Sequence, residues 1–156
     1  MGVDIELLRQ WLNSYDHNKI TIGVVASHSS LQILHGARLE GFRTLGIAVG
    51  ENRRKIYSAF PGADPDEWLM LDSYREMLDH AEWFRENNVI IIPHGSLVEY
   101  LGSTNFKSLQ VPTFGNRGIL HWESSRERQR QWLEKGGCSM PKVIDDPHEI
   151  DGPVIV

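Results

Sequence analysis

Two short polar segments carry the side chains in this sequence that are best suited to binding a charged small molecule. Residues 27–30 (SHSS) follow an apolar run and precede a segment with helical spacing, and residues 94–96 (HGS) follow a second apolar run. The first turn of a helix offers unpaired backbone N–H groups and the positive end of the helix dipole, and serine hydroxyl groups add further donors. The first segment is therefore a candidate cradle for a phosphate or another anion.

We take Ser27, His28, Ser29 and Ser96 as substrate-binding candidates. If the strands before the two segments are neighbours in a parallel sheet, their loops face one cleft at the point where the strand order reverses. A structural alternative stays open, because one serine alone can cap the helix. His28 is harder to explain as a cap, although a lone loop histidine is more often structural than functional.

Three further residues are candidates for the rim of this cleft. His94 opens the second segment, and Asn116 and Arg117 follow a fifth apolar run, where a guanidinium or an amide can reach a ligand. The alternative at the last two positions is an ordinary turn followed by the start of a helix. The sequence does not indicate which residues are catalytic.

The apolar patterning indicates elements that would position these loops. Short, β-branched runs predict buried parallel strands at residues 20–26, 44–49, 67–71, 88–93 and 111–114. Helical spacing predicts helices near residues 5–13, 31–41 and 73–87. This alternation predicts an α/β fold with a doubly wound parallel sheet over about residues 18–120.

The character of the sequence changes after residue 123. A Ser-x-x-Glu pattern at residues 124–127 predicts a polar helix that runs to Lys135 and stops at two glycines. The last three residues, after Pro153, have the apolar character of a strand that is just beginning. We therefore divide the chain into a domain at 1–123 and a segment at 124–156 that opens the next domain.

Composition excludes several functional classes. The chain has 156 residues, 40% of them hydrophobic and 24% charged, and its net charge of −5 argues against a nucleic-acid partner. No apolar run reaches the roughly 18 residues that a membrane span needs, and no signal peptide is visible, which predicts a cytoplasmic protein. The basic run at residues 53–55 reads as a solvated loop.

Motif searches give no metal or phosphate-loop site. Cys138 is the only cysteine, and the seven histidines form no His-Glu-x-x-His pattern, so we expect no metal ligands in this chain. The P-loop, the dinucleotide fingerprint and the Gly-x-Ser-x-Gly elbow are also missing from the sequence.

Several strings together carry a resemblance to a known family. They are SHSSLQILHGA (27–37), LEGF (39–42), IIIPHGS (90–96), FGNR (114–117), WES (122–124) and DGPVIV (151–156). In this order and spacing they closely resemble the N-terminal part of the archaeal formate-dependent FAICAR synthetases, the PurP-type ligases of the ATP-grasp superfamily. The resemblance covers nearly the whole chain, from about Asp4 to Val156.

The resemblance implies a Rossmann-like pre-ATP-grasp domain, followed by the start of an ATP-grasp domain. It implies an ATP-dependent C–N ligase of IMP biosynthesis that formylates 5-aminoimidazole-4-carboxamide ribonucleotide (AICAR) with formate, by way of formyl phosphate. His28 and Ser96 match positions at which the family contacts the nucleotide. ATP, Mg²⁺, AICAR and formate are the implied cofactors and partners, with a homo-oligomer or an associated ATP-grasp half.

The sequence departs from the family in length, since the ATP cleft and the magnesium carboxylates lie beyond the part that is matched. We therefore expect this chain alone to be inactive and its segment from Ser139 onward to pack poorly. The alternative to the ligase is a stand-alone nucleotide-binding or sensor module that uses the same cleft without catalysis. A third reading, a flavodoxin- or Rossmann-like domain for an unrelated ligand, fits the motifs less well.

Overall fold

The computed structural model of the chain describes residues 3–154. The chain divides into two compact units, residues 1–121 and residues 122–156. Each unit is described by itself below, and the assignment of the second to an ATP-grasp domain stays a prediction.

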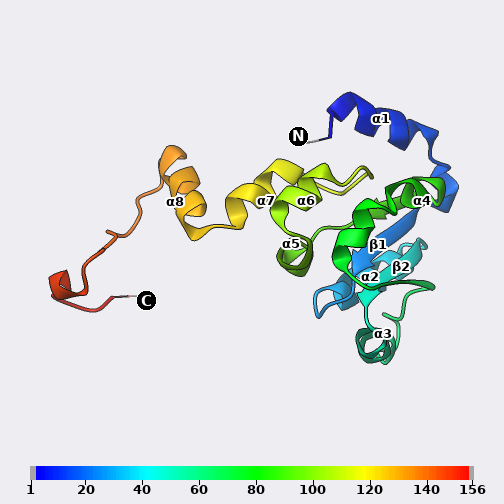
Figure 1. Cartoon of the computed structure of the whole chain (residues 1–156), viewed down its shortest axis with the longest axis horizontal. Helices are drawn as coiled ribbons and strands as arrows, with labels where there is room; N and C mark the ends of the chain where they lie inside the picture. Colours follow the sequence, from blue (N-terminus) through cyan, green and yellow to red (C-terminus); the bar gives the residue numbers. More distant parts are fainter. Residues whose placement is uncertain (1–2, 155–156) are drawn as a thin grey trace. The chain divides into compact units, whose positions relative to one another are not determined.

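A four-stranded parallel sheet forms the centre of the first unit. Its strands are β1 (Thr21–Val25), β2 (Arg43–Val49), β3 (Glu67–Leu71) and β4 (Val89–Ile91), in the order β3-β2-β1-β4. Figure 1 shows β1 and β2 lying side by side. Because β1 pairs with both β2 and β4, the strand order reverses at β1, and the two polar segments follow neighbouring strands. The predicted α/β fold is confirmed.

The prediction of a fifth strand at residues 111–114 is wrong, because this segment does not form a strand. Within the described residues this segment makes one parallel bridge, between Ile91 and Thr113. The Ile91 N–H donates to the Pro112 carbonyl oxygen, but a proline has no N–H group to return to the ladder. The carbonyl groups of Leu109 and Val111 accept hydrogen bonds from a side chain, Arg117, instead of from a strand.

Helices connect the strands and cover both faces of the sheet. The predicted helix at 73–87 is two elements, because a capping box between Ser73 and Glu76 starts a separate 3-10 turn. The helices are α1 (Ile5–Ser14), α2 (Ser30–Leu39), α3 (Glu51–Ser58), α4 (Ala81–Glu86), α5 (Gly95–Leu101), α6 (Ser103–Ser108) and α7 (Arg117–Glu123), with 3-10 turns η1 (His17–Lys19) and η2 (Tyr74–Leu78).

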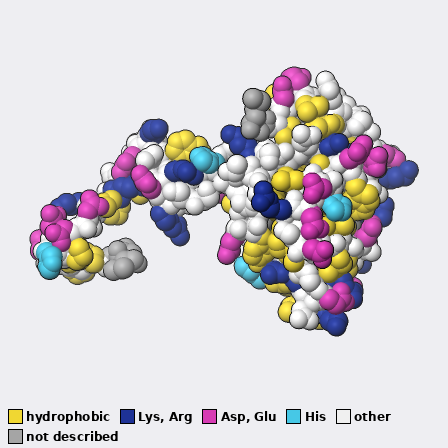
Figure 2. Space-filling model, in the orientation of Figure 1, with side chains coloured by type: hydrophobic (Ala, Val, Ile, Leu, Met, Phe, Trp, Pro, Cys, Tyr) yellow, Lys and Arg dark blue, Asp and Glu magenta, His cyan; other side chains and the backbone are white. Residues whose placement is uncertain are grey.

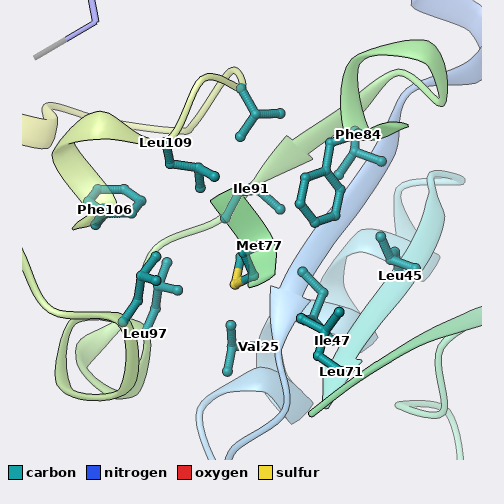
Figure 3. Packing of buried hydrophobic residues seen from close by; sticks show 13 residues of the cluster. Val25, Leu45, Ile47, Leu71, Met77, Phe84, Ile91, Leu97, Phe106 and Leu109 are labelled. Carbon is teal, nitrogen blue, oxygen red and sulfur yellow. The ribbon is translucent and has the colours of Figure 1, made fainter. Parts of the chain in front are cut away.

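The main hydrophobic core lies between the sheet and the helical segments from η2 to α6. Figure 3 shows Met77 near the middle of this cluster, next to Ile91. Phe84 and Phe106 are fully buried in it. The core holds the carboxyl ends of β1 and β4 in fixed positions, and the two polar segments follow these strands.

The second unit contains α8 (Arg126–Lys135) and a 3-10 turn, η3 (Pro147–Glu149). The predicted capping box of Ser124 and Glu127 is wrong, because the N-cap of α8 is Ser125, which accepts from the Arg128 N–H at 3.4 Å, and an arginine stands where a capping box has Glu or Gln. Ile155 and Val156, the end of the predicted last strand, lie outside the described residues. Val154 is not in a strand, and it exposes 44% of its surface.

Acidic and basic side chains are interspersed over the visible surface in Figure 2. None of the helices within residues 3–154 combines the length and the apolarity that a bilayer crossing requires.

Candidate functional site

The loop after β1 is held by two hydrogen bonds between the Ser30 side chain and the Ser27 backbone. The Ser30 hydroxyl donates to the Ser27 carbonyl oxygen at 2.6 Å and accepts from the Ser27 N–H at 3.0 Å. The Ala26 N–H donates to the Ile47 carbonyl oxygen at 2.8 Å, which continues the ladder with β2. The backbone at the start of α2 is therefore held in one shape.

Two serines of this loop are left with unused hydrogen-bonding capacity. Ser29 is the N-cap of α2, yet its side chain makes no capping bond, so the alternative of a simple serine cap does not describe Ser29. Ser27 is 1% exposed, and its hydroxyl has no partner within the described residues. Buried polar groups are normally hydrogen-bonded. This end of α2 therefore has donors to offer a ligand. His28, between the two serines, is exposed.

His94 joins the second polar segment to the end of β1. Its Nε2 lies 3.0 Å from the Val25 carbonyl oxygen. Since a carbonyl oxygen only accepts, Nε2 carries the hydrogen, and Nδ1 of the neutral ring is an acceptor. This Nδ1 is buried and has no partner in the described part of the chain. Burial lowers the pKa of His94, the Val25 contact opposes the change, and the nearby His28 lowers it further.

Ser96 lies in the first turn of α5 and is 9% exposed. The contact of His94 with Val25 and the pairing of β1 with β4 place the two polar segments at neighbouring strand ends. The structure thus brings the loops of His28 and Ser96 to one edge of the sheet. That both side chains contact a single ligand stays a prediction.

Asn116 and Arg117, the other rim candidates, make contacts within their own segment. The Arg117 guanidinium donates to the carbonyl oxygens of Leu109 and Val111 and to the Thr113 hydroxyl. Burial lowers the pKa of Arg117 to about 10. The Asn116 side chain accepts from the backbone N–H two residues later, at 2.8 Å. Their role at the rim stays a prediction.

Sequence reasoning missed Arg53 and Tyr100. The segment read as a solvated basic loop is helix α3, and Arg53 in its first turn is half-buried. Its Nη1 donates to the Ala26 carbonyl oxygen at 3.0 Å and to the Tyr100 hydroxyl at 3.1 Å. No local signal marks this contact, because it joins residues 27 and 47 positions apart in the sequence.

An apolar groove of about 700 Å³ lies elsewhere in the first unit. Its lining comes from α1, α2, one face of β1 and β4, and Phe114, and it includes neither polar segment. The groove is thus separate from the candidate site. The candidate site is identified by its set of hydrogen-bonding groups and not by the volume of a cavity.

Sequence comparison places the chain in a family. A family model described as "Protein of unknown function (DUF1246)" matches residues 22–144. The chain belongs to the DUF1246 family. Two curated relatives of this DUF1246 chain are named 5-formaminoimidazole-4-carboxamide-1-(beta)-D-ribofuranosyl 5'-monophosphate synthetase. The one from Methanosarcina barkeri is 56% identical and the one from Methanosarcina acetivorans 58% identical, each over 147 residues.

The DUF1246 chain spans about 41% of the length of these relatives, which cover 94% of it. A solved structure, described as an IMP biosynthesis protein PurP from Thermococcus kodakaraensis, is 35% identical. It matches with a TM-score of 0.67 over 83% of this chain and 41% of that one. The predicted resemblance to the N-terminal part of the FAICAR synthetases is confirmed.

Proposed function

We propose that this chain supplies the AICAR-binding surface of an ATP- and formate-dependent FAICAR synthetase, a C–N ligase of purine biosynthesis. The observation that carries the proposal is the 56–58% identity, over 147 residues, to relatives named as this synthetase. The loops of His28 and Ser96 at one sheet edge support it.

The residues at this edge match the chemistry of AICAR. The free end of α2 and the Ser27 hydroxyl offer donors to the phosphate group. The His94 Nδ1, an acceptor without a partner among residues 3–154, suits an N–H group of the amine or the carboxamide. In this arrangement the chain binds and orients the amine, and burial keeps the His94 ring neutral, so that it accepts rather than repels an N–H donor.

ATP is proposed to activate formate, so that the amine attacks a formyl carbon that carries a phosphate leaving group. Within residues 3–154 there is no group of three or more His, Cys, Asp or Glu side chains that could hold a metal ion. The described residues therefore do not fit Mg²⁺, and no step through the metal is assigned to them. We assign ATP and Mg²⁺ to the part of the relatives that this chain does not span.

A pair of serine substitutions tests binding separately from folding. Ser27→Ala removes a buried hydroxyl that has no hydrogen-bond partner in the described part of the chain, so the free energy of unfolding should stay within about 0.5 kcal/mol of wild type. AICAR affinity, measured by isothermal titration calorimetry, should fall about 5-fold, the value of one polar contact of roughly 1 kcal/mol.

Ser30→Ala is the matched control, because the Ser30 hydroxyl makes two hydrogen bonds inside the loop. It should lower the free energy of unfolding by about 1–2 kcal/mol. His28→Ala should weaken AICAR binding by roughly 1–3 kcal/mol. Wild-type affinity in both Ser27→Ala and His28→Ala would contradict the proposed site.

Activity assays separate the ligase from the sensor module. We expect the 156-residue chain alone to bind AICAR without formate-dependent turnover, and a mixture with the ATP-grasp part of a relative to produce FAICAR. AICAR binding without turnover in the mixture would favour the sensor module, and turnover by the chain alone would contradict the assignment of ATP to another part. Light scattering of the same samples measures whether the chain forms a homo-oligomer.

A further inference from the structure

Arg53 lies at the carboxyl edge of the sheet, between the segments that follow three strands. It belongs to the first turn of α3, which directly follows β2. Its Nη1 contacts the carbonyl oxygen of Ala26, after β1, and the hydroxyl of Tyr100, on α5 after β4. Its guanidinium carbon lies 4.9 Å from the centre of the Tyr100 ring. These contacts hold the guanidinium in one orientation.

The charge of this guanidinium is not paired with a carboxylate anywhere in residues 3–154. None of the ion pairs found among the described residues includes Arg53, and the nearby Glu51 pairs with Arg54 instead. Arg53 is half-buried, so part of its hydration is lost. A desolvated charge is normally paired with a charge of opposite sign. The neutral partners of Arg53 therefore point to an anion from outside the chain.

The neighbouring groups suit a phosphate anion. Ala26 directly precedes Ser27, whose buried hydroxyl has no partner in the described part of the chain. The N-terminus of α2, three residues further on, has no side-chain cap. A helix N-terminus, a hydroxyl donor and a planar guanidinium together form the donor set that binds phosphate groups.

We infer that Arg53 is the cationic partner of the phosphate monoester of the bound nucleotide. This inference rests on the proposed function, in that AICAR is the nucleotide. The N–H groups of Arg53 not used by Ala26 and Tyr100 are available to the phosphate oxygen atoms. Because Tyr100 and the Ala26 carbonyl already fix the guanidinium, little side-chain entropy is lost when the phosphate binds.

Binding of a nucleotide and of its phosphate-free nucleoside tests this role. Titration calorimetry would compare AICAR with 5-aminoimidazole-4-carboxamide riboside, for the full chain and its Arg53→Met variant. The substitution should lower AICAR affinity about 10- to 100-fold, as expected for a charge-assisted contact, and should change riboside affinity less than about 2-fold. Equal losses for both ligands would mean that Arg53 only positions the loops, and no loss for either would also overturn the inference.

Two further variants serve as controls for the Arg53→Met titration. Arg54→Met removes the same charge from the same helix, but its partner is Glu51, so AICAR affinity should stay within about 2-fold of wild type. Arg53→Lys keeps the charge, so its ratio of AICAR affinity to riboside affinity should lie between the ratios of wild type and Arg53→Met. If Arg53→Met is unfolded at the titration temperature, Arg53→Lys replaces it in the comparison. The inference would then be overturned if Arg53→Lys kept both the wild-type ratio of AICAR affinity to riboside affinity and the wild-type salt dependence of AICAR affinity.

Binding by the wild-type chain distinguishes a failure of the proposed function from a failure of the Arg53 inference. A wild-type chain that binds neither AICAR nor the riboside contradicts the AICAR assignment. Ribose 5-phosphate and inorganic phosphate then decide the anion site. Binding of either one that is lost in Arg53→Met supports the phosphate role of Arg53, and no Arg53-dependent binding overturns it.

Discussion

Arg117 offers a sharp test of how one half-buried cation organises the chain after α6. Its guanidinium donates to the Leu109 and Val111 carbonyl oxygens and to the Thr113 hydroxyl, and it lies 5.6 Å from the centre of the Phe106 ring. Arg117→Met keeps much of the apolar stem but removes the donor to the Val111 carbonyl oxygen and one of the two donors to the Leu109 carbonyl oxygen, which keeps the Val111 N–H. The attachment of the segment at 109–113 beside β4 should then rest on the bridge between Ile91 and Thr113.

The magnitude follows from these contacts. Hydrogen bonds to a charged group are worth about 1.5–3 kcal/mol each, and three of them are lost. Part of this loss is offset, because burial disfavours the charge, as the lowered pKa of Arg117 shows. We therefore expect the free energy of unfolding to fall by about 2–4 kcal/mol, which for a unit of this size is roughly 8–15 °C in Tm.

Thermal melting of the 156-residue chain, followed by circular dichroism at pH 7, measures this change. Arg43→Met is the matched control, because Arg43 makes one exposed ion pair of 3.8 Å with Glu67. The control should stay within about 1 kcal/mol of wild type. A Tm of Arg117→Met within about 3 °C of wild type would refute the reasoning.

Three further predictions concern other buried or half-buried positions. Tyr15→Phe removes a hydroxyl that donates to a β4 carbonyl oxygen at 2.9 Å, and denaturant melts should show a loss of about 1–2 kcal/mol. The folded-state pKa of His94 is below its ordinary value of 6.5. The contribution of the neutral His94 ring to the free energy of unfolding is therefore present above pH 6.5 and is lost as the pH falls below 6.5. Wild type should therefore lose more stability than His94→Gln between pH 7.5 and pH 5.5, and parallel curves would contradict this. Gly46→Ala places a methyl group about 2.6 Å from the Trp68 ring and should cost about 1–3 kcal/mol in urea melts.

Strands β1, β2 and β4 could be predicted because burial on both faces leaves a continuous hydrophobic signal. Residues 20–26 (ITIGVVA) give β1, and residues 44–49 (TLGIAV) lie within β2. The run at 111–114 carries the same signal, but Pro112 and the contacts of Arg117 limit it to one parallel bridge with β4. A local pattern therefore finds strands, whereas strand pairing depends on residues outside the pattern.

Helix α3 could not be found in this way because it buries none of its residues. Its sequence, ENRRKIYS, has no apolar stripe, and it is supported by Gly50 at φ 79°, which starts the helix, and by the pair of Glu51 with Arg54. The candidate site was predictable from strand ends, since the loops of His28 and Ser96 follow neighbouring strands. The contribution of Arg53 was not, because it comes from this unsignalled helix.

The pairing of β1 with β4 sets the order in which the site can be assembled during folding. Residue 21 pairs with residue 43, 22 positions along the chain, but also with residue 89, 68 positions along. Closing the longer loop costs more chain entropy and slows the step. The loops of His28 and Ser96 therefore meet only when the most distant strand arrives, and a nucleotide that spans them binds the finished sheet. Such a ligand should slow unfolding much more than it speeds refolding.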